Sequence, residues 1–137
     1  MMNNFADFIG MKNSHFTTPD GWDDADQYIT AEDLIVLTEY VLSVPEISEV
    51  VGVHSKEVVI SSGRSLSWTN SNELLDPDSQ FYTEGVCGVK TGTTDLAGNN
   101  LITVYKKNRR TYIAVVLGCD TDYERYMLTK ELLSYCE

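Results

Sequence analysis

Ahead of Lys56, apolar side chains recur every three or four positions, which is the spacing of amphipathic helices. Gly10 is placed to end the first of these helices in a left-handed conformation. The hydroxyl of Thr30 is placed to cap the second helix, with Asp33 three residues later as a variant of the capping box. The pattern predicts helices over residues 2–9, from Thr30 onwards and, after Pro45, over residues 46–51.

From Lys56 onwards the apolar period shortens to two, as in half-buried strands. The segment Lys107-Asn108-Arg109 is short enough to be the turn of a hairpin. A closing helix is predicted to begin at Thr121, where Glu124 completes a capping box. The predicted strands cover residues 56–60, 65–69, 85–91, 100–106 and 110–118, and the apolar face of the closing helix comprises Tyr123, Tyr126, Met127, Leu132 and Leu133.

The order of these elements predicts an α+β fold, in which an antiparallel sheet is covered by flanking helices. The chain has 137 residues and shows no internal repeat or low-complexity segment, so it forms one domain or a part of one.

The charge of the chain narrows the classes of partner. Ten basic residues against 21 acidic residues give a formal net charge of −11, which argues against nucleic acid and anionic lipid because both need a basic face. No stretch approaches the roughly 18 apolar residues of a membrane span. The first residues lack the pattern of a secretory signal, which leaves a cytoplasmic protein or a natural start elsewhere as alternatives.

Two groups of residues have the chemistry of metal ligands, but their spacing does not favour a metal site. The acidic cluster is predicted to be a solvated loop, because it lacks the spacing of an EF-hand. The cysteines are odd in number and form no C-x-x-C pair, so no zinc site is expected, and Cys119 is predicted to be a core residue. The cluster comprises Asp20, Asp23, Asp24 and Asp26, and the cysteines are Cys87, Cys119 and Cys136.

The most informative segment is Lys90-Thr91-Gly92, at the end of a predicted strand. Lys90 offers a positive charge to a ligand carboxylate, and Thr91 offers a hydroxyl beside it. Gly92 has no side chain, so another backbone can approach the strand closely. On an edge strand, this combination suits an extended peptide that ends in a carboxylate. The alternative is an ordinary strand end, and a phosphate-binding loop is excluded because Val89 replaces the glycine it needs before the lysine.

Several segments around this motif resemble one enzyme family in order and spacing. The chain resembles the later part of serine-type D-alanyl-D-alanine carboxypeptidases, which are low-molecular-mass penicillin-binding proteins. The resemblance covers nearly the whole chain. It rests on Gly10 to Phe16, Pro19-Asp20-Gly21, Tyr28 to Leu34, Trp68 to Leu75, Gly88 to Gly98 and Val115 to Gly118.

The resemblance implies a partial penicillin-recognising fold, like that of β-lactamases and transpeptidases. It implies that Lys90 has a catalytic and substrate-binding role, with its charge at the substrate carboxylate. It places the hydroxyl of Thr91 at that carboxylate, keeps the strand open at Gly92, and makes the backbone N–H of Thr93 an oxyanion-hole donor. The implied substrate is a peptidoglycan stem peptide ending in D-Ala-D-Ala, and β-lactams are possible ligands of the complete domain.

The resemblance also implies a location outside the cytoplasmic membrane and no metal or organic cofactor. The family's nucleophile motif Ser-x-x-Lys and its Ser-x-Asn motif do not occur in this sequence. Residues 1–137 are therefore expected to be a single partial domain, the C-terminal half of a catalytic domain, and to be inactive alone. The alternatives are a non-catalytic module that binds peptidoglycan peptides and a decayed remnant.

The resemblance leaves the strand over residues 110–118 as an exposed edge, which predicts self-association or pairing with a chain that carries the missing half. Around the motif, Asn70 and Asn72 are predicted to brace the preceding loop, and Asp95 to steady the turn that follows. His15 is predicted to be structural and His54 to face solvent.

Overall fold

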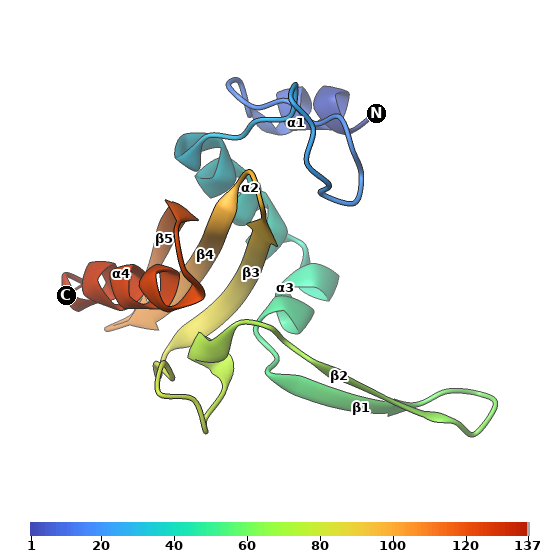
Figure 1. Ribbon diagram of the computed structural model, residues 1–137. Helices are drawn as coiled ribbons and strands as arrows, with labels where there is room; N and C mark the ends of the chain where they lie inside the picture. Colours follow the sequence, from blue (N-terminus) through green and yellow to red (C-terminus); the bar gives the residue numbers. More distant parts are fainter. Residues whose placement is uncertain (137) are drawn as a thin grey trace.

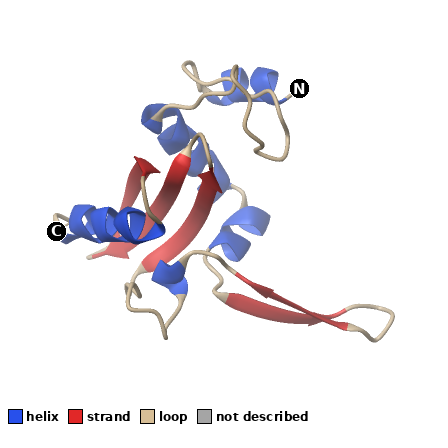
Figure 2. Ribbon diagram, viewed as in Figure 1, coloured by secondary structure: helices blue, strands red, loops and turns tan. Residues whose placement is uncertain are grey.

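The computed structural model describes residues 1–136 and confirms the α+β fold (Figure 2). Every predicted helix and strand is present, with small shifts at the ends. The elements are α1 (Met2–Ile9), α2 (Ala31–Ser43), α3 (Pro45–Val51), β1 (Ser55–Val59), β2 (Ser65–Thr69), the 3-10 helix η1 (Glu73–Leu75), β3 (Val86–Thr94), β4 (Gly98–Lys107), β5 (Arg110–Cys119) and α4 (Asp122–Ser134).

The main sheet is antiparallel and has the order β3-β4-β5, with α4 lying across one face and α2 near the other (Figure 1). Asn108 and Arg109 both have positive φ, so the β4–β5 connection is a tight turn whose twist matches that of the strands. Strand β3 is longer than the predicted strand over residues 85–91, because its pairing with β4 continues to Thr94 opposite Gly98.

The core lies between η1, β4 and α4. Leu74, Phe81, Leu101 and Tyr126 form one buried cluster, in which the rings of Phe81 and Tyr126 stack at 4.7 Å between centroids. This packing satisfies the hydrogen-bonding groups of Tyr126, because its hydroxyl donates to the Ser71 carbonyl at 2.9 Å and accepts from the Glu73 N–H at 3.2 Å.

The predicted apolar face of α4 is wrong in part. Tyr126 and Leu133 are buried as expected, whereas Tyr123, Met127 and Leu132 are exposed. The buried positions instead include Arg125 and Thr129. The reason is that α4 has the sheet on one side only, so the buried stripe is narrow and follows the register of Tyr126, Thr129 and Leu133.

The amino-terminal segment is held by the carboxylate of Asp33. The Thr30 hydroxyl caps α2 as predicted, by accepting from the Asp33 N–H at 3.2 Å. The Asp33 side chain does not close the expected capping box, and accepts instead from Lys12 N, Asn13 N and Ser14 Oγ at 2.7–3.0 Å. Burial opposes ionisation of this carboxyl, but these hydrogen bonds outweigh it and lower the pKa of Asp33 below its ordinary value.

Strands β1 and β2 form a separate hairpin that extends away from the main sheet (Figure 1). His54 lies at its base and is only partly exposed, with Nε2 3.8 Å from the Asp76 carboxylate, so the prediction that it faces solvent is wrong. His15 forms an isolated antiparallel bridge with Tyr28, and their rings stack, in keeping with a structural role. No helix of the described residues is long and apolar enough to cross a bilayer.

Candidate functional site

Strand β3 lies at the edge of the main sheet, and among the described residues it pairs with no strand other than β4. Side chains alternate between the two faces of a strand, which puts Lys90, Gly92 and Thr94 on one face and Thr91 and Thr93 on the other. Lys90, Gly92 and Thr93 are exposed, whereas Thr91 is buried. In the Lys-Thr-Gly motif, Thr91 is therefore buried, and the residues on either side of it are accessible.

Strand β3 is covered at its start and uncovered at Gly92. A Cβ atom at Gly88 would lie 2.8 Å from the Val51 carbonyl oxygen, so α3 packs directly on this part of the strand. At Gly92, by contrast, an added Cβ would meet nothing within 4 Å. The glycine of the motif therefore leaves an open approach for an extended backbone, as the sequence predicts for peptide binding along an edge.

Thr91 ties the motif to the preceding loop. Its side-chain oxygen lies 2.6 Å from that of Ser71, and only 6% of the residue is exposed. The predicted bracing by asparagines is confirmed: Asn70 Nδ2 donates to the carbonyls of Val51 and Val53, at 3.2 Å in each case. Asn72 is fully buried and caps η1 by accepting from the Leu74 N–H. A loop held by these hydrogen bonds thus contacts the strand at its buried face.

Lys90 has no acidic partner within residues 1–136. Its ammonium group donates to the carbonyl of the neighbouring Thr91, which carries no net charge. None of the ion pairs in this part of the chain involves Lys90. Because the charge is exposed and uncompensated, it can attract the carboxylate of a ligand beside the strand.

A second cation, Arg125, lies behind the strand, and sequence patterning does not reveal it. It is 6% exposed, and its guanidinium donates to the Thr93 hydroxyl at 2.9 Å. It also forms an ion pair with Asp122 and lies 5.1 Å from the centre of the Tyr126 ring. The signal in the sequence is an arginine next to Tyr126, which belongs to the predicted apolar face, three positions after an aspartate. Arg125 thus fixes Thr93 from the face opposite to Lys90.

The turn after β3 is held by Thr94, Asn100 and the distant Asp23, and not by Asp95 as predicted. The Thr94 hydroxyl donates to the Asp23 carboxylate at 2.5 Å and accepts from the Ala97 N–H at 3.0 Å. The Asn100 amide donates to the carbonyls of Ala97 and Gly98. Asp95 makes no hydrogen bond with the described residues. The acidic loop is exposed as predicted, but Asp23 also joins it to this turn.

Comparison with known proteins gives one consistent family. The D-alanyl-D-alanine carboxypeptidase family matches residues 1–121. The chain is 32% identical to the D-alanyl-D-alanine carboxypeptidase DacA of Haemophilus influenzae over 135 residues, and 35% identical to DacD of Escherichia coli over 141 residues. These alignments cover 98% of this chain, but only 32% and 33% of the relatives. The chain therefore spans about a third of the length of these curated relatives.

Solved structures show the same relationship. A DD-transpeptidase of Streptomyces, K15, superposes with a TM-score of 0.85 at 26% identity, over 98% of this chain and 51% of the other. Penicillin-binding protein D2 of Listeria monocytogenes, in its cefotaxime-bound form, superposes with a TM-score of 0.79 at 29% identity, over 97% and 52%. The fold described here thus corresponds to about half of each of these structures.

Proposed function

Because this chain belongs to the D-alanyl-D-alanine carboxypeptidase family, we propose that it supplies the substrate-binding strand of such an enzyme. The proposed substrate is a peptidoglycan stem peptide that ends in D-Ala-D-Ala. The observation that supports this most directly is the open edge of β3, where the exposed, unpaired charge of Lys90 lies beside the accessible backbone of Gly92.

In this proposal the site residues have separate tasks. The ammonium group of Lys90 attracts the terminal carboxylate of the peptide, and Thr91 anchors the strand from its buried face through Ser71. Gly92 lets the peptide backbone lie against the strand. The N–H of Thr93 donates to the oxygen that becomes negative during acyl transfer, and Arg125 fixes Thr93 in place.

The nucleophile of the reaction would come from outside this sequence. Serine acyl transfer needs an activated hydroxyl, and no serine here is followed by lysine at the third position. We therefore expect the 137-residue chain to bind a D-Ala-D-Ala peptide but not to hydrolyse it. Detectable release of D-alanine by the purified chain would contradict this expectation.

The partner that fits best is a chain carrying the other half of the domain. Strand β5 pairs only with β4 among the described residues, so its outer edge exposes backbone N–H and C=O groups. Leu117 on this strand is 39% exposed. We propose that this edge pairs with a strand of the missing half, or with a second copy, and that the assembled domain acts in the cell envelope and binds β-lactams.

The proposed carboxylate site is tested by calorimetric titration with Nα,Nε-diacetyl-L-Lys-D-Ala-D-Ala. Replacing Lys90 by Met removes the charge and keeps the length of the side chain, so it should weaken binding by about tenfold or more. Lys106→Met is the matched control, because Lys106 is an exposed lysine on the neighbouring strand and outside the motif. Equal affinities of the two variants would refute the proposal.

A further inference from the structure

The turn between β4 and β5 concentrates positive charge in an otherwise acidic chain. Residues 106–110 contain four of the ten basic residues of the chain and none of its 21 acidic residues. These four residues, here called the basic turn, are all exposed. They are Lys106, Lys107, Arg109 and Arg110.

The charge of the basic turn has no acidic partner within residues 1–136. None of the ion pairs in this part of the chain involves the four side chains. Lys107 Nζ donates to the carbonyl of Cys136 at 2.8 Å, and this acceptor carries no net charge. The basic turn therefore offers its charge to a partner outside the described chain.

The basic turn keeps these charges although they disfavour the local structure. Lys107 and Arg110 stand directly opposite each other across the strand pair, where like charges repel. Arg109 has a φ of 64° at the second position of the tight turn, where glycine is the usual residue. Two unfavourable choices in one turn are typical of a site that is kept for a function other than folding.

The directions of the four side chains indicate the shape of the partner. Side chains alternate between the faces of a strand, so Lys107 and Arg110 share one face and Lys106 lies on the other. Arg109 stands at the tip between them. A single phosphate group on one face cannot contact all four side chains. A broad anionic surface that meets the turn end-on can contact all of them.

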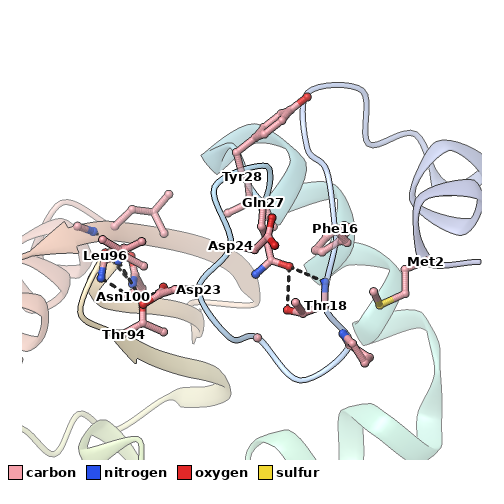
Figure 3. A pocket seen from close by; sticks show the side chains of 16 residues that line it. Met2, Phe16, Thr18, Asp23, Asp24, Gln27, Tyr28, Thr94, Leu96 and Asn100 are labelled. Carbon is pink, nitrogen blue, oxygen red and sulfur yellow. Dashed lines mark hydrogen bonds between the residues drawn. The ribbon is translucent and has the colours of Figure 1, made fainter.

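Negative charge gathers at the opposite end of the sheet, at the β3–β4 turn (Figure 1). Asp23 and Asp24 line an open cavity of about 680 Å³ there, together with Thr94 and Leu96 of the turn (Figure 3). The donors to the Asp23 carboxylate, which are the Thr94 hydroxyl and the Leu96 N–H, are neutral and leave its charge uncompensated. The two ends of the sheet therefore carry opposite charge.

The distance between the two ends lets the basic turn act on its own. Asn100 pairs with Gly92 of the motif, and the seven steps of β4 from Asn100 to Lys107 span about 23 Å at roughly 3.3 Å per residue. The Debye length at physiological ionic strength is about 8 Å, so the aspartates are largely screened from a surface at the basic turn. The formal net charge of −11 thus describes the whole chain and not this end of it.

We propose that the basic turn docks on a surface of anionic phospholipid headgroups, and that docking points the Lys-Thr-Gly motif away from the bilayer. The docking itself rests on the basic turn alone. The orientation concerns the peptide site, so its importance rests on the proposed function. In this orientation a peptide reaches β3 from the side remote from the lipid.

The test is co-sedimentation of the 137-residue chain with vesicles made of equal amounts of phosphatidylcholine and phosphatidylglycerol. Each basic residue at such a surface strengthens binding by about fivefold, so Arg109→Gln with Arg110→Gln should weaken it by about 25-fold. Lys56→Gln with Arg64→Gln is the matched control, because it removes two exposed positive charges from the other hairpin. Arg109→Lys with Arg110→Lys keeps the charge and should bind within about twofold of the parent chain.

Three outcomes would overturn the docking. The first is equal binding to vesicles of phosphatidylcholine alone. The second is a loss of binding in the control or in the lysine variant as large as in the glutamine variant. The third is binding to inorganic polyphosphate without binding to the vesicles, which would make a soluble polyanion the partner.

The orientation is tested by titrating the D-Ala-D-Ala peptide with the vesicles present. The affinity should stay within about twofold of its value in solution, because the motif and the basic turn lie at opposite ends of the sheet. A loss of about tenfold would overturn the orientation and leave the docking standing. Failure of the peptide to bind with or without vesicles would overturn the proposed function, and the orientation with it, but not the docking.

Discussion

Replacing Tyr126 by Phe should destabilise the domain by about 1–3 kcal/mol. The substitution keeps the ring, which stacks on Phe81, and removes only the hydroxyl group. That hydroxyl joins α4 to the loop before β3, through the Ser71 carbonyl and the Glu73 N–H. Tyr126 is fully buried, so these two backbone groups lose their partner where water has little access.

The measurement is the free energy of unfolding from urea titration, with fluorescence and circular dichroism as independent probes. For a domain of this length, each 1 kcal/mol corresponds to a shift of about 3–4 °C in Tm. Tyr123→Phe is the control, because Tyr123 lies on the same helix, also touches the Phe81 ring and is 55% exposed. It should change stability by less than about 0.5 kcal/mol. The reasoning fails if the two variants are equally stable.

Three further predictions concern other parts of the chain. The lowered pKa of Asp33 stabilises the fold at a pH above the pKa of an unfolded aspartate, and this stability is lost as pH falls through the lower folded value. Asp33→Asn should therefore flatten the acid side of a plot of Tm against pH, and an unchanged slope would contradict the role of this carboxylate. Gly92→Val should keep the fold, because a Cβ atom at this position meets nothing within 4 Å. It should weaken peptide binding by at least about tenfold in a calorimetric titration, because the new side chain stands where the peptide backbone would lie. Unaltered binding would exclude docking of the peptide along this edge. Burial, with a smaller contribution from Glu124, raises the pKa of the Cys119 thiol. Iodoacetamide should therefore alkylate Cys119 more slowly than Cys87 or Cys136, and mass spectrometry of the peptides would measure the three rates.

The ends of the helices could be predicted from the sequence, because they depend on contacts between residues that are close along the chain. Gly10 ends α1 with a positive φ, and Thr121 and Glu124 form the complete capping box at the start of α4. Such signals are readable because the interacting groups lie within three or four residues of each other. The family resemblance was readable for a related reason, since it rests on side chains whose order along the chain is printed in the sequence.

The long-range contacts around the candidate site could not be predicted from the sequence. Asp23 bonds to Thr94, 71 positions later, and Arg125 reaches Thr93 across 32 positions. Sequence patterning assigned the first residue to a solvated loop and did not single out the second. The periodicity of the sequence does not predict such contacts, because they depend on how the intervening residues fold.

The sequence by itself determined the order of the helices and strands, the motif on β3 and the family to which the chain is similar. The tertiary structure decided that β3 is an edge, that α3 closes its first half and leaves Gly92 open, and that a cavity lies where the strand ends. The physical reason is the range of the forces involved. Capping and periodicity act between neighbours, whereas an edge or a cavity exists only once distant segments have packed, and the burial of apolar surface that packs them carries no direction.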